Sequence, residues 1–187
     1  MAPQGRPAPG KEFTIPGDAR RSAVLMLLYP HQDAAFMPLI LRPEYGGVHS
    51  RQIGLPGGKV EPEDSDLLDT ALREAQEEIG IDRRRVEILG ELSMMYIPPS
   101  NFLVKPFVGM LDHRPEFIPQ PSEVDQLIET PVSEFWNTDN QGLHKVQVRG
   151  VNRYEVPAFT IQGHVVWGAT AMMMSELLSV LGLEPQL

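Results

Sequence analysis

The sequence predicts an α+β fold, in which strands pack with two substantial helices. Short apolar runs rich in β-branched and aromatic residues are separated by prolines and glycines, and only two segments have a long helical pattern. The strands and helices do not alternate regularly, as a doubly wound fold would require. The 187 residues are enough for one domain. We therefore expect a single domain over residues 20–187, preceded by a flexible tail over residues 1–19 that is rich in proline and glycine.

Two apolar runs near the N-terminus, residues 23–29 and residues 36–41, predict a pair of buried strands separated by polar residues. The clearest helix of the sequence follows a glycine-containing loop, and Gly80 marks its end. Asp64 and Ser65 are the candidates for its N-cap. One face of this helix is apolar and carries Leu67, Leu68, Ala71, Leu72, Ala75 and Ile79.

The remaining elements alternate between strands and short connections. Residues 86–97 and residues 102–111 are expected to be strands, separated by two consecutive prolines that cannot continue a central strand. A short helix is expected over residues 131–136, with its proline at the first position. Residues 154–166 are rich in β-forming residues around a Gln-Gly turn, and residues 169–181 are the expected closing helix.

The composition excludes several classes of function. The formal charge is −9, and such an acidic chain is poorly suited to nonspecific binding of nucleic acid. The chain has no cysteine, so it forms no disulfide, no zinc-thiolate site and no thiol nucleophile. The longest apolar run, residues 23–29, is far shorter than a membrane span, and no signal peptide is evident. We expect a cytoplasmic protein with no membrane partner.

Three carboxylates, those of Glu74, Glu77 and Glu78, share one face of the predicted helix. At 100° per residue, Glu77 and Glu78 lie about 60° and about 40° to either side of Glu74, opposite the leucines. Repulsion on this face would be relieved by a cation, and oxygen ligands without a nearby His or Cys suit Mg²⁺ or Mn²⁺. The alternative is a solvated acidic face. Two features favour the metal: Arg73 can orient Glu77, and the glycine-rich turn at Gly58 lets a backbone carbonyl approach the same ion.

These residues resemble the signature of the Nudix hydrolase family, in which a glycine, a spacer and Arg-Glu-x-x-Glu-Glu-x-Gly form a loop-helix-loop metal site. The match covers residues 58–81. The resemblance implies an α/β/α sandwich with a mixed central sheet over roughly residues 20–182. One residue is inserted relative to the usual spacing, and Glu63 and Asp64 are the two candidates for the glutamate that precedes the arginine in the family.

The segment before the helix is similar to the coenzyme A pyrophosphatase branch of this family. His49-x-x-Gln52-Ile53-x-x-Pro56-Gly57-Gly58, the upstream Leu39-x-x-Arg42 and the insertion itself carry this resemblance, as does the segment at residues 166–171. Four positions depart from the branch pattern, namely Ile40, Pro43, Arg51 and Leu55.

The branch resemblance implies a pyrophosphatase that converts coenzyme A or its thioesters to 3′,5′-ADP and a phosphopantetheine product. ADP-ribose and nucleotide sugars are the alternative substrates. A Nudix-like ligand-sensing module is the alternative that is not an enzyme, although such modules usually lose the helix glutamates that this chain keeps.

The family resemblance also implies how the reaction is carried out, by attack of water on one phosphorus of the pyrophosphate. Glu74 and Glu78 are the expected metal ligands, with Glu77 shared between metals and the Gly58 carbonyl completing the set. The general base is expected to be a helix glutamate, Glu74 or Glu77, or a carboxylate from a later loop. Glu123 is the best loop candidate, and its alternative is an exposed loop acid.

The substrate is expected to be a small nucleotide held by residues outside the helix. Arg42 and Arg51 are candidates for binding phosphates, because guanidinium groups bind them bidentately, although either could be a surface residue. His49 is a candidate contact or a solvated loop residue. Tyr96 and Asn101 form an expected binding rim or a rigid strand connection. The methionines at residues 172–174 are expected to pack in the core or in a homodimer contact.

Overall fold

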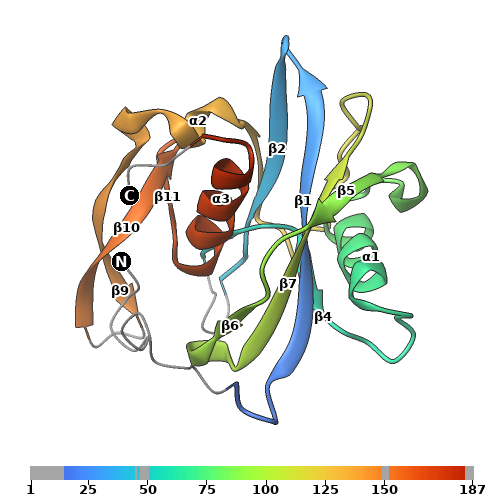
Figure 1. Cartoon of the computed structure of the whole chain (residues 1–187), viewed down its shortest axis with the longest axis horizontal. Helices are drawn as coiled ribbons and strands as arrows, with labels where there is room; N and C mark the ends of the chain where they lie inside the picture. The colour runs from blue at the N-terminus through green and yellow to red at the C-terminus, as the bar shows by residue number, and fades with distance from the viewer. Residues whose placement is uncertain (1–14, 45, 47–50, 149–151, 184–187) are drawn as a thin grey trace.

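The structure, a computed structural model, describes residues 15–44, 46, 51–148 and 152–183 (Figure 1). Its centre is strand β1 (Arg20–His31), which pairs antiparallel with β2 (Ala34–Leu41) and parallel with β7 (Phe102–Met110). The two apolar runs predicted to pair therefore do so, and Tyr29 lies opposite Phe36. Because parallel and antiparallel pairs share one sheet, the sheet is mixed, as predicted.

Five shorter strands complete the main sheet. In the described part of the chain this sheet has eight strands, with the order β3-β2-β1-β7-β5, while β4 pairs with β1, β6 with β7 and β8 with β2. The expected strand over residues 86–97 is two strands, since the chain leaves the sheet between β5 and β6 and both pair with β7. These strands are β3 (Ile53–Gly54), β4 (Gly57–Lys59), β5 (Glu87–Glu91), β6 (Met95–Ile97) and β8 (Gln126–Pro131).

Helices α1 (Leu67–Ile79) and α3 (Gly168–Val180) cover opposite faces of this sheet (Figure 1). Successive side chains of a strand point to opposite faces, and β1 follows this rule. Leu25 and Leu27 pack with the apolar face of α1, whereas Met26 packs with the residues of α3. This arrangement confirms the expected layers. It also confirms core packing for Met173 and Met174, which are 4% and 0% exposed.

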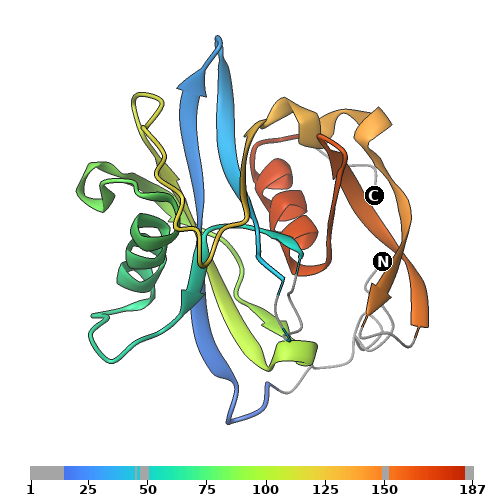
Figure 2. The same cartoon turned by 180° about the vertical axis from the view of Figure 1, so that it is seen from behind.

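A second sheet packs on the outer side of α3 (Figure 2). It consists of β9 (Gln141–Val148), β10 (Asn152–Ile161) and β11 (His164–Trp167), all antiparallel. Helix α3 therefore lies between two sheets, which explains why it is apolar around most of its circumference. The sequence analysis did not predict β9 or β8.

Two predicted helix starts are wrong. The N-cap of α1 is Asp66, whose side chain accepts a hydrogen bond from the backbone N–H of Asp69, so neither Asp64 nor Ser65 has this role. The expected helix at residues 131–136 begins later, as α2 (Ser133–Trp136), because Pro131 ends strand β8. At the other end of α1, Gly80 is the C-cap, as expected, with a left-handed φ of 75°.

The longest helices, α1 and α3, have 13 residues each. Within the described ranges, the helices are all too short or too polar to cross a lipid bilayer.

Candidate active site

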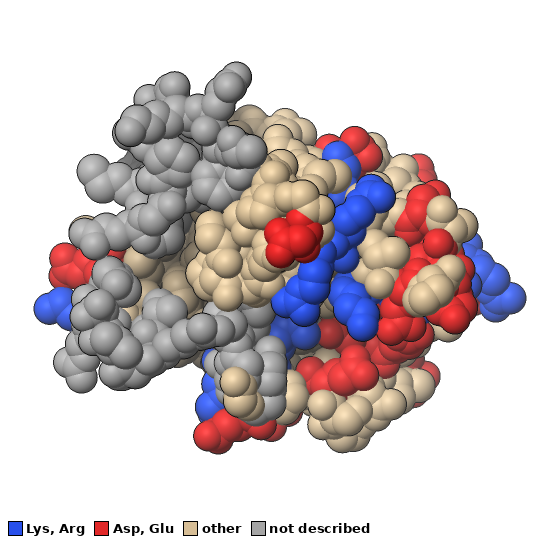
Figure 3. Space-filling view, turned by 90° about the horizontal axis from the view of Figure 1, so that it is seen from below, with Lys and Arg blue, Asp and Glu red and all other residues tan. Residues whose placement is uncertain are grey.

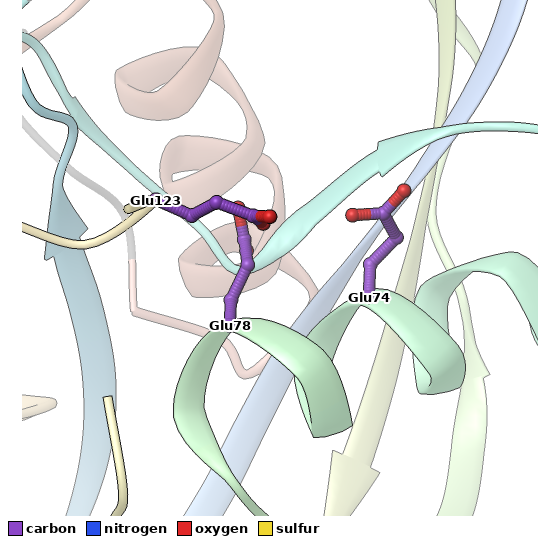
Figure 4. A group of neighbouring side chains, drawn as sticks. All are labelled: Glu74, Glu78 and Glu123. Atoms are coloured by element: carbon purple, nitrogen blue, oxygen red, sulfur yellow. The ribbon is translucent and has the colours of Figure 1, made fainter. Parts of the chain in front are cut away.

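Three carboxylates converge next to α1, the helix that packs on β1 and β4. Glu74 and Glu78 project from successive turns of α1, and Glu123 reaches them from the loop between β7 and β8 (Figure 4). Each contributes an oxygen atom, and these three atoms lie within 4.8 Å of one another. Two of the predicted helix ligands and the predicted loop acid are therefore brought together by the fold.

Glu78 is the buried member of this acidic cluster, with only 1% of its surface exposed. Its Oε2 accepts a hydrogen bond from the backbone N–H of Gly57 at 2.7 Å, and its Oε1 lies 3.3 Å from Nη1 of Arg42. Burial raises the pKa of Glu78 to about 7, although Arg42 and the Gly57 N–H oppose the shift. The nearby charges of Glu74 and Glu123 raise it further.

The pKa of Glu74 is also raised, mainly by burial and against the effect of Arg73. This residue lies directly against the backbone of β4. A methyl group on the Cα of Gly58 would overlap the Glu74 carboxylate where it now lies, so a side chain at this position would force that carboxylate to shift. The preceding Gly57 has a φ of 148° and lies against the backbone of β1, where a side chain would meet Ala23 and Val24. Gly58 therefore allows β4 to approach the acidic cluster closely, and Gly57 allows β4 to lie close to β1.

Arg73 connects the acidic cluster to the loop before α1. Its Nε and Nη2 contact the two oxygens of Asp64 at 2.7 and 3.0 Å, and Nη2 also donates to the carbonyl of Lys59 at 3.2 Å. Its Nη1 lies 3.1 Å from Glu74 and 2.9 Å from Glu77. A guanidinium held this firmly has a fixed orientation, so it can position the neighbouring glutamates.

Asp64, one of the two candidates for the family's glutamate position, is the acid that contacts this arginine. Its carboxylate also accepts hydrogen bonds from the backbone N–H of Glu61 and the hydroxyl of Thr70, each at 2.8 Å. The contact with Arg73 holds the pKa of Asp64 well below its usual range. Asp64 therefore remains charged and keeps Arg73 in place.

Glu77 does not join the acidic cluster. Its side chain is 52% exposed, and its carboxylate pairs with Arg73 four residues earlier. The helix periodicity correctly puts Glu77 near Glu74, and both carboxylates contact Nη1 of Arg73, but only Glu74 also belongs to the acidic cluster. Its predicted roles as ligand and base stay predictions, as does the role of the Gly58 carbonyl.

The loop that carries Glu123 is attached to the end of α1. The backbone N–H of Ile118 donates to the carbonyl of Ile79 at 3.0 Å, and that of Gln120 donates to the carbonyl of Glu78 at 2.9 Å. Gly80 lies against Ile118, and a side chain at Gly80 would clash with it. Glu78 thus contributes its side chain to the acidic cluster and its carbonyl to the loop that brings Glu123.

The predicted substrate contacts lie in several places. The guanidinium of Arg42 donates to Oε1 of Glu78 at 3.3 Å and to the carbonyl of Gly57 at 3.0 Å. These contacts were not predicted from the sequence. Arg51 is exposed, with a left-handed φ of 53°. The hydroxyl of Tyr96 donates to Oδ1 of Asn101 at 2.7 Å, so these two residues form one unit. His49 lies outside the described residues.

The donor set of the acidic cluster suits a hard divalent cation. It consists of carboxylate oxygens, which Mg²⁺ and Mn²⁺ prefer. In the described part of the chain, Arg42 contacts Glu78 and Arg73 contacts Glu74, but no Lys or Arg pairs with the exposed Glu123, so the repulsion among the three carboxylates is only partly offset. Acidic side chains gather on the α1 side of the molecule, next to a band of basic ones (Figure 3). A cation would remove the repulsion within the cluster, so the residues fit a metal.

Comparison with known proteins points to one family. Residues 19–149 match the model of the NUDIX domain. A protein of Photorhabdus laumondii named "Uncharacterized Nudix hydrolase NudL" is 34% identical over 69% of this chain and 68% of its own length. The human protein named "Mitochondrial coenzyme A diphosphatase NUDT8" is 34% identical over 72% of this chain, but the alignment spans only 58% of the human protein.

Solved structures share the fold. A Nudix hydrolase from M. smegmatis, RenU, superimposes with a TM-score of 0.61 at 14% identity, over 90% of this chain and 89% of its own. A MutT/nudix family protein from Enterococcus faecalis gives a TM-score of 0.56 over 94% of this chain and 68% of its own, at 16% identity. The family model covers most of the chain and agrees with the loop-helix-loop described above, so this protein belongs to the Nudix hydrolase family.

Proposed function

We propose that this Nudix hydrolase cleaves the pyrophosphate of coenzyme A or its thioesters, with a divalent metal, to give 3′,5′-ADP and a phosphopantetheine product. The observation that carries the metal-dependent hydrolysis is the convergence of Glu74, Glu78 and Glu123 within 4.8 Å. The substrate is supported by the similarity to a named coenzyme A diphosphatase and by the sequence around Arg42 and Gly58.

In this proposal Glu74, Glu78 and Glu123 would hold Mg²⁺ or Mn²⁺, and Glu77 and the Gly58 carbonyl would complete the site. When bound, such a metal neutralises phosphate charge and lowers the pKa of water. Glu123 is the exposed member of the cluster and lies on a loop, so it is also the best placed to accept a proton from the attacking water. Glu74 and Glu77 are the other candidates for the base.

The substrate would be oriented by residues around the acidic cluster. Arg51, His49 and the Tyr96–Asn101 pair are our candidates for contacts with the phosphates, the base or the pantetheine arm. Arg42 retains 27% exposure of its side chain while it contacts Glu78, so it can hold this glutamate and still present an edge of its guanidinium to a phosphate.

A substrate panel tests the proposal directly. Coenzyme A, acetyl-coenzyme A, ADP-ribose, NADH and nucleotide sugars are each incubated with the protein and Mg²⁺ or Mn²⁺, and products are separated by chromatography. We expect turnover of coenzyme A with release of 3′,5′-ADP, and loss of turnover with EDTA. Rapid turnover of ADP-ribose without turnover of coenzyme A would reject the substrate and retain the class of reaction. No turnover of any pyrophosphate would reject both and favour a ligand-sensing module.

A further inference from the structure

The loop between β7 and β8 must hold Glu123 over the acidic cluster without a helix or strand of its own. Residues 111–125 have irregular backbone throughout. Its two ends are fixed, because Leu111 donates to the carbonyl of Leu28 at 2.9 Å and Asp125 donates to the carbonyl of Leu41 at 2.9 Å. The middle is fixed by Ile118 and Gln120 on the end of α1. These contacts are all backbone hydrogen bonds, so none of them selects a particular side chain.

A side-chain network also holds this loop. Arg114 contacts both oxygens of Glu129 in strand β8, with Nε and Nη2 at 2.8 and 2.6 Å. The hydroxyl of Tyr29, which is 1% exposed, donates to Oε2 of the same glutamate at 2.9 Å. The ring of Phe117 in the loop packs edge-on against Tyr29, with 5.4 Å between ring centroids. We call Tyr29, Arg114, Phe117 and Glu129 the loop clamp.

The loop clamp is attached to the main sheet. Tyr29 belongs to the central strand β1, and Glu129 is paired with Pro38 of β2. The carbonyl of Glu129 also accepts a hydrogen bond from the side chain of Gln162 at 2.8 Å. Arg114 therefore connects a segment without regular structure to a glutamate that is fixed on three sides. A bidentate pair of this kind restricts direction as well as distance.

We infer that Arg114 is a positioning residue, which acts through the Glu129 carboxylate and the loop to hold Glu123 at the acidic cluster. The inference rests on the proposed function for the role of Glu123. Arg114 and Glu129 are partly exposed, at 44% and 26% of their side chains, so the pair contributes little to global stability. Its effect is instead local, since a shift of about 1 Å in a group that acts on the substrate can reduce a rate up to about 100-fold.

The first test needs no substrate and no metal. Hydrogen–deuterium exchange of the backbone amides of Ile118 and Gln120 is measured in the wild type, in Arg114→Met and in Arg84→Met. Arg84 is the control, because it forms a two-bond side-chain pair of the same kind with Asp82, which lies outside residues 111–125. We expect exchange about fivefold faster in Arg114→Met and unchanged in the control. Unchanged exchange in Arg114→Met would overturn the inference, whatever the substrate of the enzyme.

The second test is a double-mutant cycle on the rate of the preferred substrate. Arg114→Met is expected to lower kcat roughly tenfold with little change in KM, and Arg114→Lys to lose less. In a Glu123→Gln background, Arg114→Met should have no further effect, because the group it positions is already gone. Full additivity in this cycle, or wild-type activity in Glu123→Gln, would overturn the inference while leaving the proposed pyrophosphatase intact.

Discussion

Glu78 has a carboxylate that water does not reach, and its neighbours determine its charge. The Gly57 N–H and Arg42 stabilise the charged form, whereas burial and the two other glutamates favour the neutral one. Burial dominates, so the pKa rises to about 7. A buried carboxylate of this kind lowers the stability of the fold when it is charged. It is well suited to binding a cation, because the cation stabilises the negative charge that solvent no longer stabilises.

We expect Glu78→Gln to abolish metal-dependent turnover, with a loss of roughly 100-fold or more, and to keep the fold. The amide oxygen can still accept the hydrogen bond from Gly57, and the removed charge was buried. Activity and thermal unfolding by circular dichroism measure the two effects. Glu87→Gln, on an exposed position of β5, is the control and should match the wild type in both. Wild-type turnover in Glu78→Gln would remove Glu78 from the metal site.

The raised pKa of Glu78 also predicts how the stability of the metal-free protein depends on pH. Between its usual pKa of 4.5 and about 7, the folded state binds a proton that the unfolded state has lost, so stability falls as pH rises through this range. The difference amounts to at most about 3 kcal/mol. Asp64 acts in the opposite sense, but its lowered pKa affects stability only below pH 3.8, so the two ranges are separate.

Urea unfolding in EDTA at pH 5, 6, 7 and 8 measures this dependence. The free energy of unfolding should decline across the series for the wild type and change much less for Glu78→Gln. Equal slopes for the two proteins would show that another group is responsible.

A further prediction concerns Gly58, where the substitution by alanine adds one methyl group. In Gly58→Ala the added methyl group overlaps the Glu74 carboxylate, which is held by Arg73 and cannot move away freely. We expect the affinity for Mn²⁺, measured by calorimetry, to fall roughly tenfold. Gly90→Ala is the matched control, since a side chain at Gly90 would meet nothing within 4 Å. Unchanged Mn²⁺ affinity in Gly58→Ala would contradict the assigned position of Glu74.

At the scale of elements, the sequence identified those whose pattern is local. Helix α1 has a clear apolar face and a C-terminal glycine, and β1 and β2 are apolar runs that pair with each other. The N-cap was assigned wrongly because several acidic residues precede the helix, and only the fold shows that Asp64 is already engaged by Arg73. Strand β8 was missed because three of its residues, Gln126, Glu129 and Thr130, are polar without a regular alternation and because it ends in Pro131.

The junction between α1 and the loop that carries Glu123 depends on Gly80. Gly80 and Gly182 follow the two long helices, and both have left-handed backbones, with φ of 75° and 74°. Only Gly80 lies against another segment, since a side chain at Gly182 would meet nothing within 4 Å. Gly182→Ala should therefore cost about 1 kcal/mol in the free energy of unfolding, from the backbone alone.

Gly80→Ala should cost about 1–3 kcal/mol more than Gly182→Ala, because the methyl group meets Ile118. Urea unfolding of the two variants measures the difference. Equal costs would mean that the loop moves away easily from the end of α1, and that the attachment of the Glu123 loop is weak.

At the scale of the whole molecule, the negative charge is concentrated near the acidic cluster. Residues 61–78 contain eight acidic residues and one basic residue, so 1 − 8 = −7 of the total −9 lies in this segment. The sequence was sufficient to predict the family. It could not show that Arg42 contacts Glu78, because this pair joins residues 36 positions apart through the pairing of β2 and β4 with β1, against which α1 packs.

We expect a bound cation to raise the free energy of unfolding of the whole domain. Mn²⁺ at about 100 times its dissociation constant should add about 2.7 kcal/mol to the free energy of unfolding and raise the thermal midpoint by several degrees. Differential scanning fluorimetry with and without Mn²⁺ measures the shift, and Glu87→Gln should retain it. A shift of equal size in Glu78→Gln would place the binding site elsewhere.

Helix α3 lies between two sheets, and this arrangement has a consequence for where the folding unit ends. The NUDIX match stops at residue 149, before β10, β11 and α3. These later elements nevertheless supply one wall of the core, in which Phe159, Met174 and Leu178 cover the side of β1 and β2 that α1 does not reach. A chain shortened after residue 149 would keep every proposed ligand and uncover the core residues of the main sheet that now pack with α3. The NUDIX match therefore ends before the part of the chain that completes the core. The sheet that holds the acidic cluster is covered by residues that have no proposed role in binding or catalysis.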